Sequence, residues 1–484
     1  MGVPHVAEPA YRDEVLQVEP KGIEHVRDSE RHGQPHSVFT LWIGANVEMA
    51  TVVTGSLGVV LWGLSFWQAA IAFVIGTVLG AALLGLLSLA GPRFGVPQLV
   101  GSRRAFGFFG NFAPGILNII AGIGWYAVNS VLGAFALSYL LHLPYLLATL
   151  IMVVIQGLVA VYGHNMIHSL ERYLSIVLVL VFLAVTVYTV GHMNTGLVYD
   201  AKAPLAFGGV SGGFLATVGV SFAYMAGWMA FASDYTRYLP RTTRPGRIFG
   251  AAFGGNVIGV LWPGLLGVAL ASMAPQVVGN GTATVTGPVA MVTSLLPHVL
   301  ATILLIAVVI GTITANVLNI YSAALSTLVV NLPVHRWVAA VGIGVLGGLL
   351  TVLGQANFAG NLQNFLFLLA YWVAPWAGIV AIDAFLVHRG DGSHAIFYSR
   401  AHRFGWGFVA WLLGIAAAIP FFNQTYYQGP FALSHPQFGD LSYWVSLVVA
   451  SGFYLFFEWV SRRRRAEAPK ESAHAHVVGA GGES

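Results

Sequence analysis

The sequence predicts an all-α polytopic membrane protein with twelve transmembrane helices. Hydrophobic residues make up 57% of the 484 residues and charged residues only 8%, which is outside the range of soluble domains. The apolar residues gather in runs of roughly 20, each long enough to cross ~30 Å of hydrocarbon as a helix. These runs are 38–62, 67–91, 113–140, 145–163, 173–191, 210–232, 247–273, 299–330, 336–353, 364–388, 404–422 and 441–460.

The basic residues indicate the orientation of these helices. If the twelve runs cross a membrane in turn, every Lys and Arg except Lys202 lies on one face. Because basic residues accumulate on the cytoplasmic side, we expect that face and both termini to be cytoplasmic, in the inner or plasma membrane. The same distribution accounts for the net charge of +4, so a lipid bilayer is the expected partner and nucleic acid is not. Oligomeric state stays open.

The runs divide the chain into five parts. Residues 1–37 lack the apolar core of a cleavable signal peptide and are expected to form a cytoplasmic arm. Helices 1–5 occupy residues 38–191 and helices 6–10 occupy residues 210–388. Helices 11 and 12 follow in residues 404–460, and residues 461–484 are expected to be a disordered cytoplasmic tail.

Two spans carry polar or small residues at their centres. The first contains Asn46 and Glu48, and the sixth contains Gly219, Ser221 and Gly227, so both are expected to be interrupted. Interrupted spans at matching places in two halves of a transporter point to a binding site at the bilayer midplane. Glycine alone would serve close helix packing equally well.

Glu48 favours a functional interpretation of the first span. A carboxylate deep in a membrane span costs a few kcal/mol, so such residues usually bind substrate or carry protons. We expect one of these roles for Glu48. The alternative is a structural carboxyl that is hydrogen-bonded to Asn46 or to nearby backbone.

Several motifs occur together and in order along the chain. They are Gly91-Pro92-Arg93-Phe94-Gly95, Gly124-Trp125-Tyr126-Ala127-Val128-Asn129, Ser233-Asp234-Tyr235-Thr236-Arg237 and Gln363-Asn364-Phe365. Together they resemble the purine-cytosine permeases of the nucleobase-cation-symport-1 family. The resemblance implies a leucine-transporter-like fold, in which two inverted five-helix repeats are followed by two extra helices. It also implies a substrate held among helices 1, 3, 6 and 8.

The same resemblance implies the substrate site. Trp125 would stack on a planar ring, and Asn129, one turn further on the same face, would hydrogen-bond its edge. The second stacking ring would be Tyr224 or Trp228, and Gly227 would let the backbone approach the ligand. Further substrate contacts are expected from Asn46, Glu48 and Asn316, and Asn364 is expected in a gate.

The expected cation site departs from the family pattern. Sodium-coupled relatives combine first-span carbonyls, here between Ile43 and Asn46, with two adjacent hydroxyls in the eighth span. This chain has Thr314 followed by Ala315, so one hydroxyl is missing. With Glu48 in the cavity wall, proton coupling is favoured and sodium remains the alternative. No metal or other cofactor is expected.

The predicted function is a symporter that imports a nucleobase of the cytosine or purine type. The alternative is a sodium-coupled carrier of a hydantoin- or allantoin-like ureide or another small metabolite on the same fold. An enzyme is not expected, since His164 and His168 share a helical spacing but have no third ligand. A channel is also not expected, because no filter loop repeats.

Overall fold

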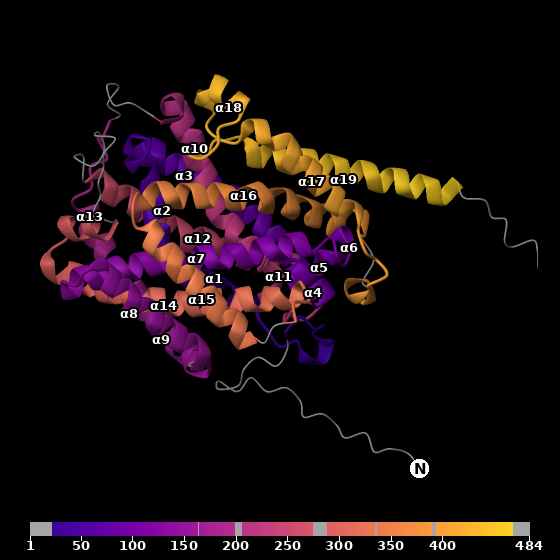
Figure 1. Cartoon of the computed structure of the whole chain (residues 1–484), viewed down its shortest axis with the longest axis horizontal. Coiled ribbons are helices and arrows are strands. Elements are labelled where there is room, and N and C mark those ends of the chain that lie inside the picture. Colours follow the sequence, from indigo (N-terminus) through magenta and orange to yellow (C-terminus); the bar gives the residue numbers. More distant parts are fainter. Residues whose placement is uncertain are drawn as a thin grey trace, which may run out of the picture.

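The computed structural model describes residues 22–162, 164–198, 206–273, 288–333, 336–389 and 394–467. Lys202, the start of the predicted arm and most of the predicted tail lie outside these ranges. The described chain is helical, and its long helices lie side by side in one bundle (Figure 1). They are α1 (Pro35–Asn46), α2 (Met49–Val60), α3 (Phe66–Ser88), α7 (Phe112–Leu141), α8 (Tyr145–Tyr162), α9 (His164–Val190), α10 (Val210–Met229), α12 (Pro245–Ser272), α14 (His298–Val329), α15 (Arg336–Gly354), α16 (Phe358–Ile382), α17 (Trp406–Ala418) and α19 (Ser442–Glu467). Short helices connect them: α4 (Ala90–Phe94), α5 (Gln98–Gly101), α6 (Arg103–Phe106), α11 (Ala232–Thr236), α13 (Pro288–Leu295) and α18 (Pro430–Ser434).

The described helices confirm a multi-pass membrane protein. Seven of them are long and apolar enough to cross a bilayer, and the bent pair α1–α2 adds an eighth candidate. Four shorter apolar helical segments are also present. Three of them lie within α8, α9 and α15, and the fourth is formed by α17 together with the short helix η6 (Ile419–Phe421). These elements coincide with the twelve apolar runs, while the count of twelve crossings and the inverted repeat stay predictions.

The first span is broken, as its polar centre predicts. Helices α1 and α2 meet at an angle of 62°, with Val47 and Glu48 in non-helical conformations between them. Side chains bind backbone carbonyls next to the break: the Asn46 amide donates to the Trp42 carbonyl at 2.7 Å, and the Thr51 hydroxyl donates to the Asn46 carbonyl at 2.6 Å. Such pairing is what a break within a membrane requires, because lipid offers no hydrogen bonds.

The sixth span differs from its prediction. Helix α10 is continuous from Val210 to Met229, and the break follows at Ala230 and Phe231, before α11 begins. The sixth span is therefore interrupted, but just after the stretch Val218–Trp228 and not within it, as was expected. A Cβ on Gly219 would lie 2.9 Å from both the Phe367 ring and the Tyr443 hydroxyl, so this glycine allows α10 to pack closely on its neighbours.

The helices form two groups that face each other. Helices α1, α2, α3, α10 and α12 pack together, and α7, α8, α9, α14 and α15 form the second group. Within the second group, α7 and α14 are antiparallel, because Asn118 bonds Ser326 at one end and Asn316 bonds Ser130 at the other. Helices α16, α17 and α19 pack beside the first group through α10. The site described below lies where the two groups meet.

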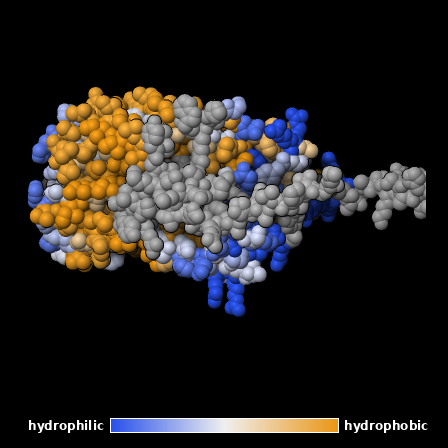
Figure 2. Space-filling model, turned by 90° about the horizontal axis from the view of Figure 1, so that it is seen from below, coloured by the Kyte–Doolittle hydropathy of each residue, from blue (hydrophilic) through white to orange (hydrophobic). Residues whose placement is uncertain are grey.

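The surface agrees with a membrane position. Hydrophobic residues cover a broad part of the face in Figure 2, and hydrophilic residues gather toward the end that carries α4, α5 and α6 in Figure 1. At that end, the described part of the N-terminal arm is bound to the loops. The Val26 amide donates to the Gly95 carbonyl at 2.8 Å, and the Arg31 guanidinium donates to the Pro92 carbonyl at 2.6 Å.

Candidate functional site

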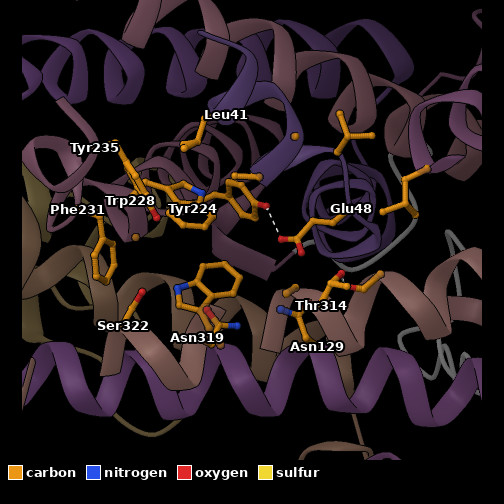
Figure 3. Close-up of a pocket in the computed structure, with 18 of the residues that line it drawn as sticks. Leu41, Glu48, Asn129, Tyr224, Trp228, Phe231, Tyr235, Thr314, Asn319 and Ser322 are labelled. Carbon is orange, nitrogen blue, oxygen red and sulfur yellow. Dashed lines mark hydrogen bonds between the residues drawn. The ribbon is translucent and has the colours of Figure 1, made fainter. Parts of the chain in front are cut away.

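Glu48 lies at the break of the first span and faces a cavity between the two helix groups. It immediately precedes α2, in extended backbone. The Tyr224 hydroxyl of α10 donates to Glu48 Oε1 at 2.9 Å (Figure 3). The same hydroxyl oxygen lies 2.6 Å from Thr51 Oγ1. The break thus places a carboxyl group where α10 reaches it through a single tyrosine.

Hydrogen atoms along this chain of contacts can be counted. Three contacts join Glu48, Tyr224, Thr51 and the Asn46 carbonyl in series. Tyr224 and Thr51 supply one hydroxyl hydrogen each, so two hydrogens serve three contacts when Glu48 is ionised. When Glu48 is protonated at Oε1 it can donate to the Tyr224 hydroxyl, which then donates to Thr51. Each of the three contacts then has one hydrogen. The arrangement therefore suits a carboxyl group that gains and loses a proton.

A second set of hydrogen bonds fixes α1 against α10 and α12. The Trp228 indole donates to Asn46 Oδ1 at 2.9 Å, and the Asn46 amide donates to Asn256 Oδ1 at 3.1 Å. Asn46 is fully buried and does not line the cavity, whereas Trp228 does. Asn46 therefore holds the break in shape and orients the Trp228 ring.

Trp125 stands at the centre of an aromatic cluster. Its ring meets Tyr224 edge to face at 5.4 Å between centroids, and it meets Phe365 of α16 in the same way at 5.2 Å. A Cβ on Gly227 would lie 3.1 Å from Trp125 Nε1, so the absence of a side chain there makes room for the indole. Because the Trp125 and Tyr224 rings already touch, a planar ligand can lie between them only after one of them moves.

Asn129 and Thr314 form the polar part of the opposite wall. Asn129 lines the cavity from α7 but is only 2% exposed, and its side-chain oxygen has no hydrogen-bond partner. Thr314 lines the cavity from α14 and donates to the Gly311 carbonyl at 2.8 Å. In Figure 3 both lie across from Glu48 at the same end of the pocket. A buried acceptor without a donor is costly, so Asn129 is suited to a ligand that presents an N–H group.

Asn316 is placed differently from Asn129. It is fully buried between α7 and α14, where its amide donates to the Tyr126 carbonyl at 3.0 Å and to Ser130 Oγ at 2.8 Å. Its side-chain oxygen accepts from Asn319 at 3.1 Å, and Asn319 itself lines the cavity. Asn316 therefore reaches the cavity through Asn319 in this conformation.

The remaining expected residues lie around this centre. The Ile43 carbonyl accepts from the Val47 amide at 3.1 Å, so it is used within the break. Asn364 lies on α16, where its amide donates to Thr425 Oγ1 at 3.0 Å and its oxygen accepts from the Thr425 amide at 3.3 Å. Asn364 thus ties α16 to the segment between α17 and α19, away from the cavity lining.

The cavity has a volume of about 860 Å³. It brings together residues that are far apart in sequence, from α1, α7, α9, α10, α11 and α14 and from the break before α2. Of the expected site residues, those that line it are Glu48, Trp125, Asn129, Tyr224, Gly227, Trp228 and Thr314. Ala315 lines it too, at the position where the family pattern has a second hydroxyl.

Sequence reasoning missed two contacts of this centre. Thr51 completes the series of contacts from Glu48, and Phe365 holds the far side of Trp125. Thr51 could have been found from its position, since it follows Asn46 and Glu48 in the broken segment and a released carbonyl needs a nearby hydroxyl. Phe365 belongs to the motif Gln363-Asn364-Phe365, but nothing in that motif indicated a contact with Trp125, because an aromatic residue in a membrane helix usually faces lipid or a neighbouring helix.

The comparisons with known proteins agree with this architecture. The profile of the family described as permease for cytosine/purines, uracil, thiamine, allantoin matches residues 25–446. A putative purine-cytosine permease of Bacillus subtilis is 29% identical over 471 residues, which cover 93% of this chain and 98% of the relative. The purine-cytosine permease fcyB of Emericella nidulans is 28% identical and covers 91% of this chain and 88% of its own length.

Solved structures show the same fold. The inward-facing conformation of Mhp1 has a TM-score of 0.71 and 18% identity, and covers 93% of this chain and 96% of that one. The closed conformation of Mhp1, a nucleobase-cation-symport-1 family transporter with bromovinylhydantoin bound, gives a TM-score of 0.69 at 20% identity, with 93% and 97% covered. The fold is therefore the leucine-transporter-like fold that the motifs imply. The chain belongs to the family of permeases for cytosine/purines, uracil, thiamine and allantoin.

Proposed function

We propose that this permease is a secondary active symporter that imports a nucleobase of the cytosine or purine type by alternating access. Membership of the family makes the protein a membrane transporter and not an enzyme. The observation that carries the substrate proposal is that the Trp125 ring and the unpartnered Asn129 oxygen line the cavity together, one turn apart on the same face of α7. A flat ring with N–H groups at its edge satisfies both, through stacking and a hydrogen bond.

The coupling ion in this proposal is the proton. Glu48 is joined to Tyr224, Thr51 and the Asn46 carbonyl by three contacts in series, which have one hydrogen each only when Glu48 is protonated. Protonation of Glu48 would therefore favour this conformation, in which α1 and α10 are linked. Loss of the proton would weaken the link and so connect proton movement to the relative positions of these two helices.

The two helix groups supply the moving parts. We propose that α1, α2, α3, α10 and α12 move together against α7, α8, α14 and α15, with the base held between them. Both termini would be cytoplasmic, in keeping with the distribution of basic residues. Asn364 would act at a gate through its contact with Thr425 on the face opposite the termini.

A second candidate is a sodium-coupled carrier of a hydantoin or a related ureide. A hydantoin permease of Microbacterium maritypicum is 27% identical over 419 residues, and the closed neighbour structure contains a hydantoin. Thr314 retains one of the two hydroxyls of the sodium pattern and lines the cavity. Hydantoins offer the same flat face and N–H groups as a nucleobase, so the cavity chemistry alone fits both.

Transport into proteoliposomes tests the proposal. Purified protein would be reconstituted, and uptake of radiolabelled cytosine and hypoxanthine measured under an inward proton gradient or an inward sodium gradient. Unlabelled purines, pyrimidines, hydantoin and allantoin would serve as competitors. The proposal expects uptake driven by the proton gradient, abolished by a protonophore and competed by bases.

The other outcomes are distinct. Uptake driven by the sodium gradient would show that the coupling ion is sodium and not the proton, and it would not affect the proposal about the substrate. Competition by hydantoin or allantoin with none by the bases would move the substrate to the second candidate. The Trp125→Ala variant is expected to bind its substrate roughly 10- to 100-fold more weakly, because stacking of one base on an aromatic ring contributes about 1–3 kcal/mol. Unchanged affinity in that variant would remove Trp125 from the site.

A further inference from the structure

The cavity extends well beyond the residues around Glu48. Its volume of about 860 Å³ is near the upper end of the ~300–1,000 Å³ range typical of sites for drug-sized ligands, and a one- or two-ring base is smaller than such ligands. The lining continues to His36, Ser37 and Thr40, at the start of α1. A single base at Trp125 and Asn129 leaves much of this volume unfilled.

The pattern of lining residues repeats along the cavity walls. On α7, Asn118 precedes Trp125 by seven residues, a distance of about 10 Å along a helix. On the antiparallel α14, Ser322 follows Thr314 by eight residues, or about 12 Å. Along α10 and α11, Phe231 follows Tyr224 by seven residues, and Tyr235 follows Trp228 by the same number.

These residues form a second cluster of rings and polar groups. Phe231 and Tyr235 lie on one wall and Ser322 on the opposite one, all on the side of the pocket away from Glu48 (Figure 3). Phe231 sits in the break between α10 and α11, with its ring centroid 6.4 Å from that of Trp228 at an angle of 68°. The break turns this ring into the cavity, where it is partly exposed.

The polar groups of the second cluster offer acceptors. The Asn118 amide nitrogen donates to Ser326 Oγ at 2.9 Å, and the Asn319 amide nitrogen donates to Asn316 Oδ1 at 3.1 Å. Both residues line the cavity, and the side-chain oxygen of each has no donor among the hydrogen bonds of the described chain. The cluster therefore combines aromatic rings with amide oxygens in the cavity lining, as Trp125 and Asn129 do two turns away.

We propose that Phe231, Tyr235, Asn118, Asn319 and Ser322 form a second binding station for the same planar, N–H-bearing heterocycle. This inference rests on the proposed function. The station lies between the Trp125 site and the cytoplasmic mouth, so an imported base occupies it after leaving Trp125 and before release. One chain then holds two bases at once when the cavity is open to the cytoplasm.

Equilibrium binding to the purified full-length protein tests the second station. Radiolabelled hypoxanthine would be titrated in a scintillation proximity assay, with the protein concentration set by amino-acid analysis. The expected result is saturation at two molecules per chain. Two variants should each reduce the number of bound molecules to one per chain. Ser322→Leu places a bulky side chain in the second station, and Trp125→Ala removes the stacking ring of the first.

Two further variants make the assay specific. Thr302→Leu introduces the same side chain near the start of α14, outside the cavity lining, and should retain two molecules per chain. Phe231→Leu removes the ring with little change in volume, and should give one molecule per chain if Ser322→Leu does not fold.

The outcomes separate the two proposals. Saturation at one molecule per chain that Ser322→Leu and Phe231→Leu leave unchanged and Trp125→Ala removes would overturn the second station while supporting the nucleobase site. Absence of saturable binding of hypoxanthine, cytosine and the other bases would overturn the proposed function itself.

Discussion

The two walls of the cavity differ in how their polar groups are used. On the α1–α10 wall, Glu48, Tyr224, Thr51 and Asn46 are bonded to one another, and Trp228 joins them through its indole. On the α7–α14 wall, Asn129 has a buried oxygen with no partner. The polar groups of the first wall are bonded to one another, whereas the second wall has an acceptor that a ligand can complete. We therefore propose that the first wall serves proton coupling and the second serves substrate recognition.

Replacing Glu48 with Gln should have the largest effect. The amide keeps the shape of the side chain and cannot exchange a proton, so proton-driven accumulation of the base should be abolished. Equilibrium binding of hypoxanthine should persist, because Trp125 and Asn129 are untouched. Accumulation assays under a proton gradient, paired with binding assays, check this expectation. Proton-driven accumulation at the wild-type level in the variant would remove Glu48 from coupling.

Asn316 and Asn129 form a matched pair on the second wall, and we expect opposite effects from them. Asn316→Ala removes a fully buried amide, together with its hydrogen bonds to the Tyr126 carbonyl, to Ser130 and from Asn319. The cost should be about 1–3 kcal/mol of folding stability, since buried polar groups lose their bonds. Thermal unfolding of the purified protein measures it. An unchanged unfolding temperature would show that Asn316 does not hold α7 to α14.

Asn129→Ala should instead weaken binding while sparing the fold. Its oxygen has no protein partner, so removing it leaves no donor unsatisfied. Loss of one hydrogen bond to the base should weaken affinity roughly 3- to 10-fold, in line with about 0.5–1.5 kcal/mol per bond. Affinity and unfolding temperature would be measured on the same preparation. Loss of stability equal to that of Asn316→Ala would contradict the contrast drawn between the two residues.

The smallest change is Tyr224→Phe. It retains the ring against Trp125 and removes only the hydroxyl between Glu48 and Thr51. Affinity for the base should stay within about threefold of wild type, because no bond to the base is removed, while proton-driven accumulation falls. Thr51→Val is the matched variant, because it removes the hydroxyl that lies between Tyr224 and the Asn46 carbonyl in the same series of contacts. A large loss of affinity in Tyr224→Phe with intact accumulation would assign the hydroxyl to substrate binding.

Much of the fold could be predicted from local sequence. The length of the apolar runs predicted the helices, and the polar groups at Asn46 and Glu48 predicted the break in the first span. The orientation that the basic residues indicate stays a prediction. The break in the sixth span was expected within Val218–Trp228 but lies just after it, because a glycine that admits a neighbouring helix and a glycine that ends a helix look alike in sequence. The neighbours that distinguish them, Phe367 and Tyr443, lie far along the chain.

The site was predicted as a set of residues but not as a set of contacts. Trp125, Asn129, Glu48 and Tyr224 were expected near the substrate, and they line one cavity. Sequence could not distinguish the environments of Asn129 and Asn316, since each is an asparagine within an apolar helix. Their difference depends on Ser130, Tyr126 and Asn319, whose approach to Asn316 is a property of how α7 and α14 pack.

Substrate-induced proton movement tests the central claim most directly. Protein reconstituted in weakly buffered vesicles containing a pH-sensitive dye would receive external hypoxanthine without any imposed ion gradient. The account predicts acidification of the vesicle lumen that requires the base, disappears in Glu48→Gln and persists at a reduced rate in Asn129→Ala. Uptake of the base without lumenal acidification, or acidification that survives in Glu48→Gln, would contradict the assignment of coupling to the α1–α10 wall.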